Sequence, residues 1–124
     1  MEDLHDRVVN ALKGSLNNNE YDIYINPGQE KNAHIGENYP DVIMVKKGTS
    51  TAEFILEVEV ASSVTQEEAL RQWKKYSKEI NATFYLVVPQ GSLAKAKGIC
   101  QSNNINVRFA TYIENNNNIT FKFS

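Results

Sequence analysis

The chain has 124 residues, of which 41% are hydrophobic and 23% are charged, and this predicts a single domain, residues 1–124, with a core that needs no structural metal. Its one cysteine excludes an internal disulfide, and its formal net charge of -2 argues against a general nucleic-acid coat protein. The N-terminus has no apolar signal core and no apolar run approaches membrane-spanning length, so we expect a cytoplasmic protein with no membrane partner.

The first half of the chain predicts one helix followed by three strands. Apolar residues at helical spacing predict an amphipathic helix over residues 2–16. Alternating side chains predict a strand at 21–25, and the polar, glycine- and proline-containing segment 27–38 is typical of a loop. Two apolar runs, 39–45 and 53–60, are joined by a short polar segment and therefore predict a hairpin or an adjacent strand pair.

The second half predicts a helix, a strand, another helix and two final strands, over residues 65–80, 83–88, 92–102, 106–113 and 119–123. Thr65 and Glu68 match a capping box, so the first of these helices should begin at Thr65. A strand–helix–strand crossover implies a parallel strand pair. The order of elements therefore predicts a three-layer α/β domain with a mixed sheet.

Acidic residues fall at one end of the predicted strand pair. Asp41 opens the first strand, and Glu57 and Glu59 lie late in the second, on the same side of it. If the strands pair, three carboxylates converge, which suits a Mg²⁺ ion and phosphodiester chemistry. The alternative is that both glutamates line the solvated face of an edge strand, although the apolar residues before them favour an interior strand.

Charge is unevenly distributed along the chain. Residues 1–39 contain seven acids and three bases, whereas residues 71–97 contain six bases and one acid. A polyanion such as a nucleic acid would be attracted to the second region. A solvated helix face is the plainer interpretation of the same charges.

The acidic residues stand in a recognisable order. Pro40-Asp41, then fifteen residues, then Glu57-Val58-Glu59 resembles the PD-(D/E)XK nuclease superfamily. The resemblance covers residues 2–88. It implies a three-layer restriction-endonuclease-like fold, an αβββαβ core with a mixed central sheet, here followed by an additional helix and C-terminal strands.

The following helix carries Gln72 and Tyr76, which are similar to the Gln-x-x-x-Tyr motif of RecB-type members of this superfamily. The resemblance implies that Gln72 is catalytic, orienting the site or touching the phosphate backbone. The residues predicted to bind substrate on this helix are Gln72, Lys74, Lys75 and Tyr76. Tyr76 shares its spacing with core positions, including Trp73, so core packing is an equal alternative for it.

For the metal, the resemblance implies that Asp41 and Glu57 are ligands of one or two Mg²⁺ ions, with Mn²⁺ as a substitute. The backbone carbonyl of Val58 would lie near the metal. Glu59 is a catalytic candidate that departs from the family, which has a lysine at this position. Three explanations stay open: the glutamate acts through metal or water, a lysine (Lys46, Lys74 or Lys75) reaches in from elsewhere, or catalysis has been lost.

The first helix supplies a site residue in many members of the superfamily. Glu2, His5 and Asp6 are the candidates here, and none matches well enough to assign. We expect His5 to be a surface residue of the helix. His34, in the loop before Pro40, is expected near the mouth of the site or free in solvent.

The sequence therefore predicts a Mg²⁺-dependent nuclease that hydrolyses DNA phosphodiester bonds. The alternative is a catalytically inactive module that binds nucleic acid or protein on the same fold, and a weaker third is a plain interaction domain. A chain of this length leaves little room for a recognition domain, so a homodimer or a partner protein could supply specificity. The residues from 106 onward could form the dimer edge.

Overall fold

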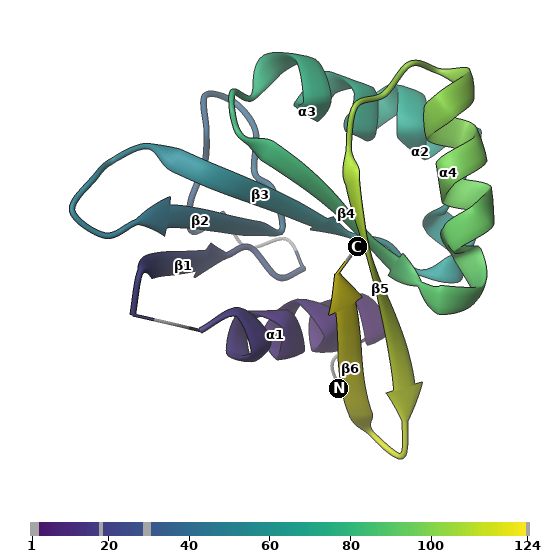
Figure 1. Cartoon of the computed structure of the whole chain (residues 1–124), viewed down its shortest axis with the longest axis horizontal. Coiled ribbons are helices and arrows are strands. Elements are labelled where there is room, and N and C mark those ends of the chain that lie inside the picture. The colour runs from purple at the N-terminus through teal and green to yellow at the C-terminus, as the bar shows by residue number, and fades with distance from the viewer. Residues whose placement is uncertain (1–2, 18, 29–30, 124) are drawn as a thin grey trace.

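One six-stranded sheet forms the centre of the protein, with helices on both of its faces (Figure 1). The computed structural model describes residues 3–17, 19–28 and 31–123. The strands are β1 (Tyr21–Ile25), β2 (Val42–Lys46), β3 (Ala52–Val58), β4 (Thr83–Pro89), β5 (Arg108–Asn115) and β6 (Asn118–Phe123). They lie side by side in chain order, with β3, β4 and β5 parallel and the other neighbours antiparallel. The predicted mixed sheet and α/β class are confirmed.

The helices are α1 (Leu4–Leu16), α2 (Gln66–Glu68), α3 (Lys74–Glu79) and α4 (Leu93–Ser102). A π-helical stretch, Ala69–Trp73, connects α2 to α3, so the three pieces form the continuous helix predicted from the sequence. Its N-cap is as predicted, because the Thr65 hydroxyl accepts a hydrogen bond from the backbone N–H of Glu68. Among the described residues, no helix combines the length and the apolar character needed to cross a membrane.

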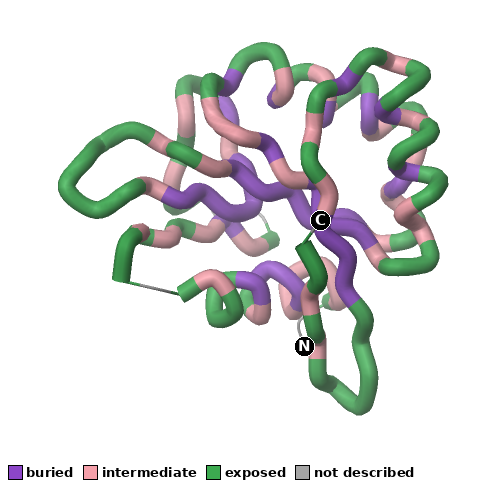
Figure 2. Tube along the Cα trace, in the orientation of Figure 1, coloured by how far each residue is buried: buried purple, intermediate pink, exposed green. Residues whose placement is uncertain are grey.

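Side chains that alternate along the strands pack into two separate hydrophobic cores, one on each face of the sheet. On one face of the sheet, α1 packs Val8, Val9 and Leu12 against residues such as Leu56 and Val58 of β3. On the other face the helices from α2 to α4 pack against the remaining buried strand residues, Ile43, Ile55, Phe84, Leu86 and Val88. Buried residues are therefore concentrated along the central strands (Figure 2), and the domain has the three layers that the sequence predicts.

The central position of β3 matters for the acidic residues. This strand pairs with β2 on one side and with β4 on the other, so it is an interior strand. The parallel pairing of β3 with β4 confirms the predicted crossover. The interpretation that Glu57 and Glu59 line the solvated face of an edge strand is wrong, because each residue is only 3% exposed.

The last hairpin is tighter than predicted. The expected turn at 114–118 is reduced to Asn116 and Asn117, because β5 continues to Asn115 and β6 begins at Asn118. Both turn residues have positive φ, 51° and 67°, which asparagine tolerates better than most residues. The antiparallel strand β6 extends the sheet beyond the three parallel strands and forms its outer edge.

The packing of α1 can be tested with two leucine substitutions. Leu12 of α1 is fully buried, whereas Leu70 of the π-helical stretch is 49% exposed. We expect Leu12→Ala to lower the free energy of unfolding by about 3 kcal/mol, because it leaves a cavity between α1 and the sheet. Leu70→Ala should change it by less than about 0.5 kcal/mol. Urea unfolding of both variants measures this, and equal losses would contradict the described packing.

Candidate functional site

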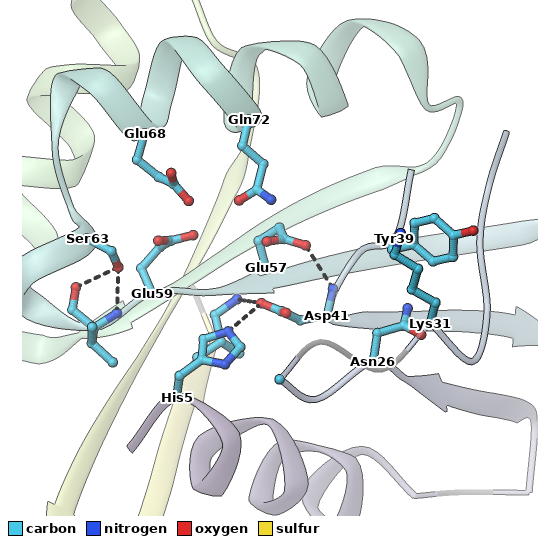
Figure 3. A pocket seen from close by; sticks show the side chains of 13 residues that line it. His5, Asn26, Lys31, Tyr39, Asp41, Glu57, Glu59, Ser63, Glu68 and Gln72 are labelled. Carbon is cyan, nitrogen blue, oxygen red and sulfur yellow. Dashed lines mark hydrogen bonds and ion pairs between the residues drawn. The ribbon is translucent and has the colours of Figure 1, made fainter. Parts of the chain in front are cut away.

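A pocket of about 370 Å³ opens where β2 begins and β3 ends (Figure 3). Its walls come from both layers of helices: α1 lies on one side, and the helix that runs from α2 to α3 lies on the other. The loop between β1 and β2 closes a third side. The pocket therefore lies at the point where the two hydrophobic cores meet the end of the sheet.

Asp41 and Glu57 are locked together by the backbone of the neighbouring strand. The backbone N–H of Asp41 donates to Glu57 Oε1 at 2.8 Å, and the backbone N–H of Val58 donates to Asp41 Oδ2 at 2.8 Å. These two bonds continue the β2–β3 pairing beyond its last ladder pair, Val42 with Leu56. The structure thus brings the two predicted metal ligands together as buried neighbours.

The pocket carries an excess of negative charge. Within the described residues its lining includes four carboxylates, Asp41, Glu57, Glu59 and Glu68, against Lys31 and His5. Burial raises the pKa of Glu57 well above its ordinary value, and the charges of Asp41 and Glu59 raise it further. The pocket therefore favours a positive charge over a negative one, although among the described residues only Asp3, His5 and Asp6 place three ligand atoms within 4.8 Å of one another.

Glu59 is held in place by bonds to its side chain and to its backbone. Its Oε2 accepts from the indole N–H of Trp73 at 3.1 Å, and its backbone carbonyl accepts from the Tyr112 hydroxyl at 2.9 Å. Burial raises the pKa of Glu59 to about 7, against the hydrogen bonds from Ser63 and Trp73, which lower it. Glu59 is thus a rigid part of the pocket wall.

Gln72 faces the acids from the opposite side of the pocket (Figure 3). With its amide nitrogen turned toward them, it donates to Glu68 Oε2 at 2.9 Å and to Glu57 Oε2 at 3.1 Å. The other end of the amide lies 3.4 Å from the Tyr76 hydroxyl. Arg71 holds the second oxygen of Glu68 at 2.6 Å. Gln72 therefore links Glu57 to Glu68.

The other predicted helix residues lie away from the acids. Tyr76 is 6% exposed and packs edge-on against Phe84, so it belongs to the core, with only its hydroxyl near Gln72. Lys74 is half-buried and Lys75 is exposed, and neither is among the residues that line the pocket. Any contact they make with a substrate would lie outside this pocket.

The lysine that lines the pocket is one that sequence reasoning did not select. Lys46 ends β2 at the opposite end from Asp41, and like Lys74 and Lys75 it is absent from the described lining. Lys31, from the loop, does line the pocket, and its ammonium lies 5.1 Å from the centre of the Tyr39 ring. It is held there by a cation–π contact, and nothing in its sequence surroundings indicates this.

His5, a first-helix candidate that the sequence left unassigned, reaches the pocket. Its Nε2 lies 3.1 Å from Asp41 Oδ2 (Figure 3). Its Nδ1 lies 2.9 Å from Asp6 Oδ1. The hydrogen bond to Asp41, opposed by burial, raises the pKa of His5 to about 9, so the imidazole is cationic at neutral pH. Asp6 also accepts from the backbone N–H of Gly28 at 2.8 Å and so ties the loop to α1. Ligand atoms of Asp3, His5 and Asp6 lie within 4.8 Å of one another.

A spacing signal for His5 was present. It lies three and four residues before Val8 and Val9, which are buried against the sheet, and helical residues at these spacings share a face. His5 lies at the edge of this face, with its side chain 30% exposed. Glu2 lies outside the described residues. His34 is exposed and lines a different depression, beside Tyr24, rather than this pocket.

Asn26 organises the loop that carries Lys31 and Asp41. Its side-chain nitrogen donates to the carbonyls of Ala33 (2.8 Å) and Pro40 (2.7 Å), and its side-chain oxygen accepts from the backbone N–H of Ala33 (2.9 Å). Its own backbone N–H donates to the carbonyl of Asp41 at 3.0 Å. The side chain of this buried asparagine supplies hydrogen bonds to loop backbone groups that have no partner in a helix or strand.

Removing the Asn26 side chain should loosen the loop. We expect Asn26→Ala to lower the free energy of unfolding by roughly 3 kcal/mol, because several buried backbone groups lose their partners. The matched control is Asn81→Ala at an exposed position, which should cost less than about 0.5 kcal/mol. Urea unfolding measures both; an Asn26 variant as stable as the control would refute this role.

The raised pKa of Glu59 predicts a pH dependence of stability. Its pKa is 4.5 when exposed and about 7 in the fold, so its contribution is complete below about pH 4.5 and is lost as the pH rises through about 7. Wild type should lose roughly 3 kcal/mol more than Glu59→Gln between pH 4 and pH 8, because glutamine does not titrate. Urea unfolding of both proteins across this range measures the difference; parallel curves would show that Glu59 is not buried as described.

Comparison with known proteins gives no match: no family model matches the chain, and neither curated proteins nor solved structures give a significant similarity.

Proposed function

We propose that the protein is a Mg²⁺-dependent nuclease that hydrolyses DNA phosphodiester bonds, with the pocket at the β2–β3 end as its active site. The observation that carries this proposal is the pair of buried carboxylates, Asp41 and Glu57, each fixed by the backbone of the other's strand. Buried carboxylates that repel each other are costly unless they serve a cation. Their position in an open pocket gives that cation access to a substrate.

The architecture supports a restriction-endonuclease-like fold. The elements α1, β1, β2, β3, the helix from α2 to α3, and β4 follow one another in the αβββαβ order that the sequence resemblance implies. The first three strands are antiparallel neighbours, and β4 is parallel to β3. In this proposal α4, β5 and β6 are additions to the core, and the edge strand β6 is a candidate surface for a second copy.

The residues of the pocket fit a hard divalent cation. Mg²⁺ is held by one or two carboxylates and keeps several waters, and Mn²⁺ binds similar oxygen ligands. Asp41 and Glu57 would hold the ion, with the backbone carbonyl of Val58 beside them, and His5 Nε2 is within reach of the same Asp41 oxygen. The bound ion would polarise a phosphate oxygen and lower the pKa of a water.

The protein's own groups have defined tasks in this scheme. Gln72 holds one Glu57 oxygen and so fixes the direction in which the carboxylate faces the pocket. Glu59 offers a further acceptor for a water near the phosphate. Lys31 and the cationic His5 are the positive groups available to a phosphate inside the pocket. Lys74 and Lys75 would meet the nucleic-acid backbone outside it.

A specific observation also favours the alternative function, an inactive module that binds nucleic acid or protein. Glu59 occupies the position at which the resembled superfamily has a lysine, and Trp73 holds it there. His5 already places a positive charge on Asp41, as a cation would. A protein that had lost catalysis could keep this arrangement for stability alone.

A nuclease assay distinguishes an active nuclease from a module that only binds. Purified protein with Mg²⁺ or Mn²⁺ should cut DNA, and Asp41→Ala or Glu57→Gln should lower the rate by at least roughly 100-fold, because each removes a metal ligand. The control is Glu53→Gln, an exposed glutamate on the same strand, which should cut like wild type. Cutting that survives both active-site substitutions would rule out this pocket as its source.

Calorimetric titration with Mn²⁺ separates a metal site from an inert module. Binding should tighten as the pH rises from 6 to 8, because the raised pKa values of Glu57 and Glu59 mean that the ion must displace protons. Salt-sensitive DNA binding without any Mn²⁺ binding would instead support the module.

A further inference from the structure

We propose that Trp73 is a positioning residue of this pocket: its indole N–H fixes the carboxylate of Glu59 so that Glu59 can orient the attacking water. This inference rests on the proposed function, since it assigns a task within the same reaction. Trp73 touches neither the substrate nor the ion in this scheme and acts only through Glu59.

The contact itself is buried and specific. Trp73 is fully buried and Glu59 is 3% exposed, with the indole nitrogen 3.1 Å from Glu59 Oε2. An indole offers a single donor and no acceptor, so its N–H needs a partner when it is buried. A hydrogen bond to a carboxylate is stronger than one between neutral groups. Trp73 is therefore more than a packing residue of the helix.

The backbone of Glu59 is also fixed, although β3 ends one residue earlier. Its N–H donates to the carbonyl of Val87 at 2.9 Å, and its carbonyl accepts from Tyr112 at 2.9 Å. With both backbone groups held, the carboxylate can move only by rotating its side chain. The bond from Trp73 removes that remaining freedom and leaves the carboxylate in one orientation.

The π-helical stretch explains how two consecutive residues reach the acids. Ala69–Trp73 has the wider π-helical turn, in which consecutive side chains diverge by a smaller angle than in an α-helix. Gln72 consequently reaches Glu57 and Glu68 while Trp73 reaches Glu59. The wider turn therefore lets both side chains contact acidic residues of the pocket.

A fixed carboxylate has a use in hydrolysis. Glu59 and Glu57 lie side by side in the pocket wall, with the Glu59 carboxylate directed into the space below Glu68 and Gln72 (Figure 3). A water that donates a hydrogen bond to Glu59 would be held beside the ion site at Asp41 and Glu57. Such an acceptor orients the water, and the position of the water matters for the rate.

The test is Trp73→Phe, which keeps a ring in the core and removes the N–H. We expect kcat for DNA cleavage to fall roughly 10- to 100-fold, with KM and Mn²⁺ affinity close to wild type. The matched control for lost packing is Ile80→Ala, which makes a cavity in the same core cluster at the other end of the helix. Although less stable, this variant should keep the wild-type kcat when folded.

A double variant separates positioning from packing. If Trp73 acts through Glu59, Trp73→Phe combined with Glu59→Gln should cut no more slowly than Glu59→Gln alone. A Trp73→Phe protein with kcat within about twofold of wild type would overturn the proposal, as would effects that multiply in the double variant.

Three further outcomes test the proposal. If Trp73→Phe does not fold, the proposal requires that Glu59→Gln lower kcat at unchanged KM and shift the fluorescence of Trp73, the single tryptophan of the chain; wild-type kcat or unchanged emission would overturn it. If wild type neither binds Mn²⁺ nor cuts DNA, the proposed function fails and this inference fails with it. If wild type cuts and Trp73→Phe cuts equally well, only this inference fails.

Discussion

Two hydrogen bonds from backbone N–H groups to carboxylates, at the end of the β2–β3 pair, fix the geometry of the pocket. The N–H of Asp41 binds Glu57 and the N–H of Val58 binds Asp41, both at 2.8 Å. Each bond stabilises a carboxylate, yet together they hold two negative groups side by side in a buried place, which raises the pKa of Glu57. The pairing of the strands thus places two carboxylates where their mutual repulsion is unfavourable. The surrounding residues contact these two carboxylates.

The three layers of the fold each contribute to this pocket. From one face, α1 brings the cationic His5 to Asp41. From the other face, the widened helix brings Gln72 to Glu57 and Trp73 to Glu59. The loop between β1 and β2, which has little regular structure, is shaped by hydrogen bonds of the buried Asn26 side chain. A site at the end of an interior strand can draw on all of these elements because both faces of the sheet are covered.

Local patterns in the sequence predicted the elements that depend on neighbouring residues. The Thr65 cap, the alternation in β1 and the convergence of Asp41 with Glu57 were readable because capping and strand pairing follow from short-range spacing. Lys31 and Asn26 were missed, and His5 was left unassigned, because their roles depend on the irregular loop between β1 and β2 and on how α1 packs against it, which helix and strand periodicity do not describe. The π-helical stretch has no sequence signal of its own, so the simultaneous use of Gln72 and Trp73 could not be predicted.

We propose above that Asp41 and Glu57 bind a divalent cation. Crystals of the protein soaked in Mn²⁺ test it most directly, by anomalous difference density at the manganese edge. We expect a peak between the two carboxylates, with metal–oxygen distances of about 2.2 Å, and no peak there in Glu57→Gln crystals. A well-soaked crystal with no anomalous peak at the pocket would contradict it.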